Sequence, residues 1–252
     1  GIVTIGLGHD VAFSPGGTAI AFVDGSTVHV AGPAGANVRS LAIGGFPAWT
    51  PDGSRVAFIK PVRCLAGCTW PGTVDAADPV TQTMSLTPMA SDDDRKGIKR
   101  FDVAPNGTEV AYILAGDMKT QDALVVSNID GSNRRILLER NFCQPGTGCS
   151  GGIFSVRYSP NGQELLANAA CYDGMESAAC GVIAIPVSGA APRVLAPLPR
   201  RGWDWSPDGT KVLISQTAGG ESTLLTVSSA DGSGAETVYE HDFVVTSAAW
   251  AR

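Results

Sequence analysis

The chain has 252 residues, 44% hydrophobic and 17% charged, and its 31 glycines and 16 prolines are typical of a fold built from turns. The hydrophobic share excludes a disordered chain, and no stretch reaches the ~18 consecutive apolar residues that a membrane-spanning helix requires. Eighteen basic residues against 24 acidic ones give a net charge of −6, which argues against nucleic acid as the main partner.

A short turn motif recurs along the chain. A Ser, Thr or Ala is followed by Pro, then by Gly, Asp or Asn, and then by Gly. With the residue before it, the motif occurs at Phe13–Gly17, Trp49–Gly53, Val103–Gly107, Tyr158–Gly162 and Trp205–Gly209. Proline pre-sets φ for the second turn position, Asp or Asn suits the third, and Gly supplies the left-handed residue that leads into the next strand. Each copy therefore predicts a hairpin between two strands.

An apolar run follows each copy and predicts the second strand of a repeat. These runs are Ala19–Phe22, Val56–Ile59, Val110–Ile113, Leu165–Ala167 and Val212–Ile214. A second set of turns is predicted to join third and fourth strands, at Gly35–Asn37, Asp130–Ser132, Ser188–Ala190 and Asp231–Ser233. The last repeat predicts strands near Gly202–Trp205, Lys211–Gln216, Thr223–Ser228 and Glu236–Tyr239. Four strands at this spacing are typical of a propeller blade.

The segment from Trp205 to Val212 resembles the signature repeat of TolB-like β-propellers, and five copies of that repeat cover nearly the whole chain. The resemblance implies an all-β fold, a β-propeller of four-stranded antiparallel blades, with residues 1–252 as a single domain. Ile2–Ile5 and Thr246–Trp250 are expected as terminal closure strands, with Trp250 matching the tryptophan of the motif. We expect five blades; because TolB-like propellers usually have six, a six-bladed ring with a reduced last blade is the alternative.

The six cysteines fall into three close pairs, each in a segment rich in small residues. The pairs are Cys64 with Cys68, Cys143 with Cys149, and Cys171 with Cys180. Paired cysteines in loops favour disulfides formed in an oxidising compartment, so we expect an extracellular or periplasmic protein. Nearest-neighbour pairing is the connectivity we expect among the alternatives, and reduced thiols or a zinc site are the competing interpretations. The chain opens directly on a strand-like run without a signal peptide, which we interpret as a mature or trimmed chain.

The predicted strand order assigns the loops to two rims. The short motif turns share one rim, and the long loops with all six cysteines share the other, at Pro61–Thr69, Thr87–Lys99, Glu139–Gly152, Cys171–Cys180 and Glu240–Val245. Variable loops on a rigid scaffold are where binding usually resides, so the cysteine-bearing rim is the predicted functional face.

Charged and aromatic residues cluster where the first strands begin on that rim. The candidate binding residues are His9, Asp10, Lys99, Arg100, Asp102, Arg157, Arg201, Trp203 and Asp204. Arginines at one mouth could hold a carboxylate or a phosphate of a ligand. The alternative is that the same arginines pair with Asp10, Asp102 and Asp204 and merely satisfy a polar interior.

The sequence predicts no catalytic residue, metal site or cofactor. A nucleophile elbow, a P-loop and a dinucleotide fingerprint are missing, and Asp92–Asp94 lacks the spacing of a calcium loop. We therefore expect a non-catalytic extracytoplasmic binding module, as the TolB-like resemblance implies. It would act as a scaffold or sensor for another protein or a small anionic ligand, within a larger protein or as a secreted chain.

Two enzyme hypotheses stay open at this point. One is a propeller hydrolase or lyase that acts on an anionic saccharide or lactone at the mouth, with candidate residues His9, Asp10, Arg100, Asp102, Arg157 and Asp204. The other is the gating propeller of a prolyl-oligopeptidase-like enzyme, whose hydrolase domain would lie outside this chain.

Overall fold

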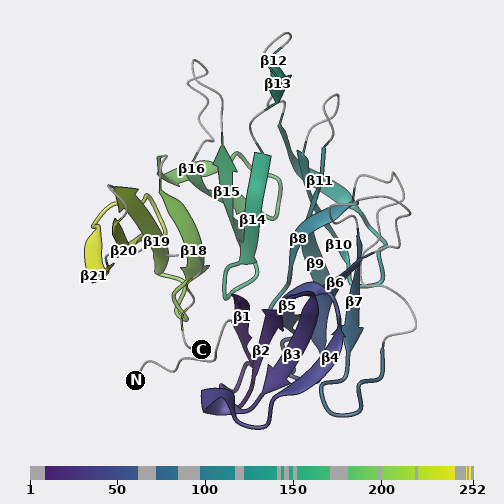
Figure 1. The fold of residues 1–252 in the computed structure, drawn as a ribbon. Helices are drawn as coiled ribbons and strands as arrows, with labels where there is room; N and C mark the ends of the chain where they lie inside the picture. Colours follow the sequence, from purple (N-terminus) through teal and green to yellow (C-terminus); the bar gives the residue numbers. More distant parts are fainter. Residues whose placement is uncertain are drawn as a thin grey trace. The chain divides into compact units, whose positions relative to one another are not determined.

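The computed structural model of the chain is all-β, with one short 3-10 helix, η1 (Pro33–Gly35), in its described part. The structure describes residues 9–61, 72–84, 97–116, 122–140, 143–144, 148–149, 152–170, 181–197, 200–218, 221–241, 248 and 250. These residues form five sheets and one small hairpin, labelled strand by strand in Figure 1. The predicted β-propeller with five antiparallel blades is confirmed, and each sheet is one blade.

The strands follow one another in chain order within each blade. The first blade is β1 (His9–Phe13), β2 (Ile20–Asp24), β3 (Thr27–Ala31) and β4 (Arg39–Ile43). The second is β5 (Gly45–Trp49), β6 (Val56–Pro61) and β7 (Gly72–Ala77). The third is β8 (Ile98–Val103), β9 (Glu109–Leu114), β10 (Asp122–Asn128) and β11 (Arg135–Arg140). The fourth is β14 (Gly152–Tyr158), β15 (Glu164–Ala170), β16 (Gly181–Pro186) and β17 (Arg193–Ala196). The fifth is β18 (Arg201–Trp205), β19 (Lys211–Ala218), β20 (Glu221–Ser228) and β21 (Glu236–His241).

The fifth blade confirms the strand pattern expected from the sequence, with β19 and β20 two residues longer than predicted where they face each other. The second blade has three strands among the described residues, and an isolated bridge from Ala77 to Met84 continues the pairing beyond β7. Four of the predicted long loops overlap a strand by one or two residues at their ends. The overlapping end residues are Pro61 in β6, Lys99 in β8, Glu139 in β11, Gly152 in β14 and Glu240 in β21.

The turn motif forms the same hydrogen-bonded unit in successive blades. In the fifth blade the Gly209 N–H donates to the Ser206 carbonyl at 2.8 Å, and Gly209 has a φ of +72°. The Ser206 hydroxyl donates to Asp208 Oδ1 at 2.6 Å and accepts from the Lys211 N–H at 2.9 Å. The hydroxyl thus links the two strands at the point where the turn closes, which is why the position before Pro is Ser or Thr in four of the copies.

Middle strands are buried on both faces, and outer strands are not. Ile20–Val23, Val56–Ile59 and Val182–Ile185 are buried at every position, whereas β4 has exposed residues at both ends. A blade packs its sheet between neighbours, so its central strands need continuous apolar runs instead of alternation. This requirement explains the apolar run after each turn motif.

The chain divides into two compact units, residues 1–115, 126–135 and 251–252 in one and residues 116–125 and 136–250 in the other. The core of the first unit includes Val28, Val56 and Phe58, and the core of the second includes Leu166 and Trp205. The single domain 1–252 expected from the sequence stays a prediction.

Several predictions from the sequence lie outside the described residues. They are the closure strand Ile2–Ile5, most of Thr246–Trp250, and the cysteines Cys64, Cys68, Cys171 and Cys180. Cys143 and Cys149 belong to the hairpin of β12 (Cys143–Gln144) and β13 (Gly148–Cys149), where they are direct cross-strand partners. That register suits the expected nearest-neighbour disulfide, which itself stays a prediction. Among the described residues, no helix has the length and apolar character needed to cross a membrane.

Candidate functional site

Each of the five first strands carries a β-bulge near its start. The register shifts between His9 and Ala12, Gly45 and Ala48, Ile98 and Arg100, Ile153 and Ser155, and Gly202 and Asp204. In a bulge, two residues of one strand lie opposite a single residue of the neighbouring strand, which changes the direction of a side chain. Bulges are common next to active and binding sites. The first strands are therefore regular near the turn motif and irregular at the opposite end, where the candidate residues lie.

The structure places every candidate binding residue in a first strand. His9 and Asp10 lie in β1, Lys99, Arg100 and Asp102 in β8, Arg157 in β14, and Arg201, Trp203 and Asp204 in β18. Lys99 and Trp203 are themselves bulge residues, because the register shifts between Ile98 and Arg100 and between Gly202 and Asp204. Within the first unit β1 contacts β5 and β5 contacts β8, and within the second unit β14 contacts β18.

In the first unit an aromatic ring supports an arginine. The Arg100 guanidinium lies 3.6 Å from the centre of the Phe46 ring, and its Nη1 donates to the Lys99 carbonyl at 2.7 Å. Phe46 and Asp10 both have left-handed backbones, with φ of +55° and +52°, at the same distance before the turn motif in neighbouring blades. Left-handed φ at a bulky residue is strained and is held by its surroundings. The stack on Phe46 and the bond to the Lys99 carbonyl fix the plane of the guanidinium.

Sequence reasoning missed Phe46. The signal that could have found it is its position, because Asp10, Phe46 and Arg100 each stand four residues before the first residue of their turn motif. When the repeats are aligned on their turn motifs, Phe46 takes the position that Asp10 and Arg100 have in their own repeats. A search for charged residues alone does not find it.

In the second unit an asparagine fastens two first strands. Asn168, buried in β15, donates from Nδ2 to Ser155 Oγ at 2.6 Å and to the Gly202 carbonyl at 2.8 Å. The Gly202 N–H donates to Asn168 Oδ1 at 2.7 Å. The side-chain amide thus pairs with the backbone of β18 as a strand would, and it joins β14 to β18. We call these contacts the Asn168 clamp.

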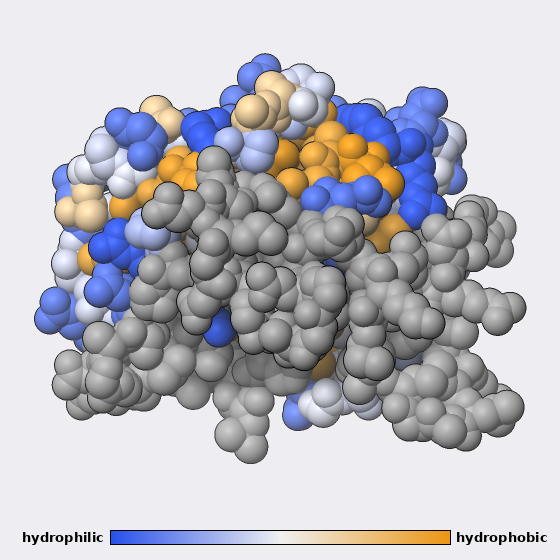
Figure 2. All heavy atoms as spheres, turned by 90° about the horizontal axis from the view of Figure 1, so that it is seen from above, coloured by the Kyte–Doolittle hydropathy of each residue, from blue (hydrophilic) through white to orange (hydrophobic). Residues whose placement is uncertain are grey.

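Exposed residues flank the Asn168 clamp. Phe154, the bulge residue of β14, is 53% exposed, and Arg201, which precedes Gly202, is also exposed. Trp203 follows Gly202 and is half-buried. Figure 2 shows apolar residues beside hydrophilic ones on the coloured part of the face seen from above. Exposed aromatic and arginine side chains at strand starts are the residue types that binding surfaces favour.

Asp204 is buried, and its carboxylate serves the backbone. It accepts hydrogen bonds from the Trp205 N–H at 2.9 Å and from the Trp250 N–H at 3.2 Å. Trp250 therefore lies beside β18. Arg200, just before β18, donates from Nε to Gln216 Oε1 at 3.0 Å. Asp204 thus orders the local backbone.

The motif tryptophans fasten neighbouring blades. Trp49 Nε1 donates to the Ala12 carbonyl at 3.1 Å, and Trp205 Nε1 donates to the Arg157 carbonyl at 3.3 Å. In both cases the acceptor lies two residues before the turn motif of the preceding blade. In these two copies the tryptophan before the turn links neighbouring blades, a role beyond the hairpin expected from the sequence.

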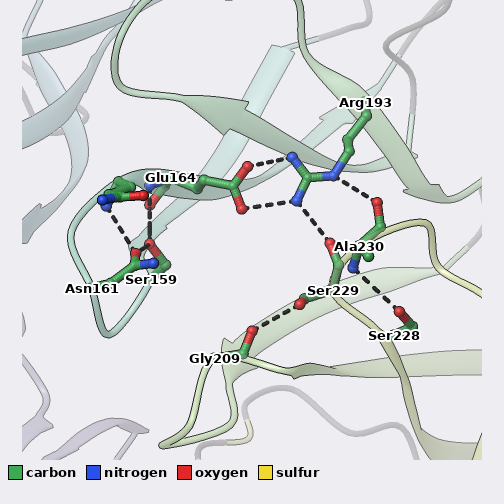
Figure 3. Close-up of polar contacts among 9 residues, drawn as sticks. Ser159, Asn161, Glu164, Arg193, Gly209, Ser228, Ser229 and Ala230 are labelled. Atoms are coloured by element: carbon green, nitrogen blue, oxygen red, sulfur yellow. Dashed lines mark hydrogen bonds and ion pairs between the residues drawn. The ribbon is translucent and has the colours of Figure 1, made fainter.

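A second fastening joins the fourth and fifth blades at their outer strands (Figure 3). Arg193 of β17 forms a bidentate ion pair with Glu164 and donates to the carbonyls of Ser229 at 2.8 Å and Ala230 at 2.9 Å. The Glu164 hydrogen bonds raise the pKa of Arg193 above its ordinary value. Every donor of this arginine that is drawn in Figure 3 contacts the protein, so we interpret it as structural.

Among the described residues, no three histidine, cysteine or carboxylate side chains lie together as a metal site would require. The described contacts at the first-strand starts involve an arginine on an aromatic ring and the carboxylate of Asp204, which accepts from backbone N–H groups.

Comparisons with known proteins show the fold. A protein assigned as TolB from Agrobacterium tumefaciens is 16% identical, with a TM-score of 0.68, and the match covers 93% of this chain and 81% of that one. TolB from Acinetobacter baumannii is 14% identical, with a TM-score of 0.65, and the match covers 92% of this chain and 55% of that one. An oligogalacturonate lyase from Vibrio parahaemolyticus is 10% identical, with a TM-score of 0.61 over 91% of this chain and 64% of the lyase. No family model and no curated protein matches the sequence. The predicted TolB-like propeller is thus confirmed as a fold.

Proposed function

We propose that this propeller is a non-catalytic binding module that acts outside the cytoplasm and holds an anionic group of a partner at the starts of its first strands. The observation that carries the proposal is the Phe46–Arg100 stack. An arginine laid on an aromatic ring is oriented before a ligand arrives, which lowers the entropy lost on binding. Carboxylates and phosphates match the paired N–H groups along the edge of such a guanidinium.

The fold supports this proposal through its rigidity. Turn motifs, tryptophan bonds and the Asn168 clamp fix the strands, while the bulged strand starts present side chains. Binding constellations are most precise when they stand on rigid elements whose backbone is already paired. The TolB proteins with the same fold make a partner-binding role the natural first candidate.

A capture experiment tests the proposal. The chain is immobilised without reductant, and the native extracellular or periplasmic fraction is passed over it. We expect a partner that wild type retains and that the triple variant Arg100→Ala/Arg157→Ala/Arg201→Ala loses. The matched control is Arg39→Ala/Arg134→Ala, which removes exposed arginines away from the first strands and should retain the partner. Equal retention by the triple variant, with unchanged melting, would refute the placement of the site.

The compartment is part of the same proposal. Cys143 and Cys149 are opposite each other in a two-stranded hairpin, and cross-strand positions of this kind are close enough for a disulfide. We expect iodoacetamide to alkylate no cysteine of the unreduced, denatured protein, so that mass spectrometry finds no added mass. Six alkylated thiols would instead place the chain in a reducing compartment.

A further inference from the structure

Phe154 and Arg201 are exposed residues near the starts of β14 and β18. Phe154 is 53% exposed and is one of eight large hydrophobic residues that are exposed in the described part of the chain. Among the described residues, none hydrogen-bonds or ion-pairs with the Arg201 guanidinium and none stacks on the Phe154 ring. We call this pair the Phe154–Arg201 surface.

The Asn168 clamp fixes how these two residues stand relative to each other. Ser155 and Gly202 contact the same Asn168 Nδ2 at 2.6 and 2.8 Å. Phe154 precedes Ser155, and Arg201 precedes Gly202, so each is one residue beyond the clamp on the starting side of its strand. The bulge at Phe154 removes it from cross-strand pairing and lets its ring face outward.

Arg201 supplies the charge of this pair. It is exposed at the start of β18, whereas Arg200 before it donates from Nε to Gln216 Oε1 at 3.0 Å. An exposed guanidinium favours an anionic group of a ligand over a neutral one.

We propose that the Phe154–Arg201 surface binds a uronic acid residue of an acidic saccharide, with the sugar stacked on Phe154 and its carboxylate on Arg201. The proposal rests on the proposed function, because it names a ligand class for one part of the same set of strand starts. The C–H groups of a pyranose face carry partial positive charge and match the negative face of an aromatic ring. The carboxylate of a uronic acid projects from the edge of that ring and suits the planar guanidinium beside it.

The clamp favours a saccharide over a peptide. A peptide that adds to a strand edge needs free backbone groups, and both the N–H and the carbonyl of Gly202 are already paired with Asn168. A peptide that binds through an apolar side chain needs a desolvated pocket, whereas Phe154 offers an exposed ring. The C–H face of a sugar ring needs neither free backbone groups nor a deep pocket.

Calorimetric titration with hexamannuronate and with neutral mannohexaose tests the inference. We expect hexamannuronate to bind more tightly than mannohexaose. Phe154→Ala should weaken both by about tenfold, since it removes the stacking surface. Arg201→Gln should weaken hexamannuronate by about tenfold and leave mannohexaose unchanged, since only the former has carboxylates. The matched controls Val238→Ala and Arg39→Gln remove an exposed apolar and an exposed basic residue elsewhere and should change neither affinity.

Three results would overturn the inference. They are no heat of binding up to about 10 mM saccharide, equal affinity of wild type and Phe154→Ala, and tighter binding of an acidic, aromatic-containing peptide that depends on the same two residues. To separate the two proposals, the capture experiment is repeated with Arg100→Ala alone, which leaves Arg201 in place, and with Phe154→Ala. A partner that is still captured by Phe154→Ala while hexamannuronate fails to bind would remove this inference and leave the proposed function standing.

Discussion

Two junctions between neighbouring blades use the same residue types in opposite ways. Between the second and third blades, Arg100 covers the ring of Phe46, so the aromatic surface is occupied by the protein itself. Between the fourth and fifth blades, Phe154 and Arg201 are both exposed, and each precedes one of the two first-strand partners of Asn168. In the first junction the arginine lies on the aromatic ring, and in the second the aromatic ring is left exposed.

The difference follows from how the junction of the fourth and fifth blades is fastened. Near the strand starts, Asn168 of the fourth blade bonds the backbone of Gly202, and at the turn-motif end Arg193 donates to the carbonyls of Ser229 and Ala230 in the fifth blade. The junction is held by groups other than Phe154 and Arg201. Residues that the packing does not need are available for a ligand, and a rigid junction keeps them in place. The predictions below test this division between fastening and presenting residues.

The largest effect is expected at Gly232, where the turn of the fifth blade meets β17. A Cβ there would lie 1.8 Å from the Leu195 carbonyl oxygen, and Gly232 has a φ of +76°. We expect Gly232→Ala to destabilise the chain by about 3 kcal/mol or more, because it combines a backbone clash with strain. Gly234→Ala is the control: φ is +64° but no atom lies within 4 Å, so only the strain of about 1 kcal/mol applies. Urea denaturation measures both, and equal losses would contradict the close packing of this junction.

The next largest loss of stability is expected when the Asn168 clamp is removed. Asn168→Leu removes three hydrogen bonds and leaves the N–H and carbonyl of buried Gly202 without their partner. Unsatisfied buried groups cost about 1–3 kcal/mol each, so we expect a loss of about 2–4 kcal/mol. Asn168→Asp keeps an acceptor for the Gly202 N–H but buries a carboxylate oxygen against the Gly202 carbonyl, so it should cost at least as much as Asn168→Leu. Amide hydrogen exchange at Gly202 should rise in the leucine variant; unchanged protection would mean that the clamp does not join the strands.

Substituting the tryptophans of the turn motif should cost less stability, and the cost should differ between the two units. Trp205 is 1% exposed and Trp49 is half-buried, although their indole N–H groups make equivalent bonds of 3.3 and 3.1 Å. We expect Trp205→Phe to cost about 2 kcal/mol, from the lost bond and the cavity, and Trp49→Phe about 1 kcal/mol, mostly from the bond. Thermal melting of the two variants decides this order. A larger loss for Trp49→Phe would show that burial does not set the difference.

The sequence predicts the hairpins well because their determinants are local. Pro207, Asp208 and Gly209 fix a turn by their own dihedral preferences and short-range hydrogen bonds, and the apolar runs must be buried strands. The Asn168 clamp joins residues 34 positions apart, and no local preference of Asn indicates a partner at Gly202. Phe46 is likewise ordinary in sequence until its place before the turn motif is counted.

The candidate site is therefore predicted only in outline. Its basic residues are visible in the sequence at the first-strand starts. The bulges are not, because a bulge depends on the pairing of two strands and leaves no residue signature at Lys99, Phe154 or Trp203. Which arginine is covered by a ring and which stands free follows from packing between blades, and a single strand does not encode it.

The smallest expected effect is on stability at low pH. It compares the copies of the turn motif that have Asp with those that have Asn. Hydrogen bonds from Thr50 and Ser54 hold the pKa of Asp52 at about 2, and those from Ser206 and Thr210 do the same for Asp208, while the third and fourth blades have Asn106 and Asn161 in this place. An unfolded aspartate titrates at about 3.9, so the folded state holds these protons less tightly. Their stabilisation is complete above about pH 4 and is lost as the pH falls towards 2.

Asp52→Asn/Asp208→Asn should thus flatten the fall in stability between pH 4 and pH 2. Because both side chains are exposed, solvent screens the effect, and we expect a small change in slope with similar stability at pH 7. Thermal melting of wild type and the double variant across this range measures it, with Asn106→Asp/Asn161→Asp as the reciprocal variant that should steepen the fall. An unchanged slope in both would mean that the turn carboxylates keep their hydrogen bonds in the unfolded chain, where the local Ser-Pro-Asp-Gly sequence would already form the turn.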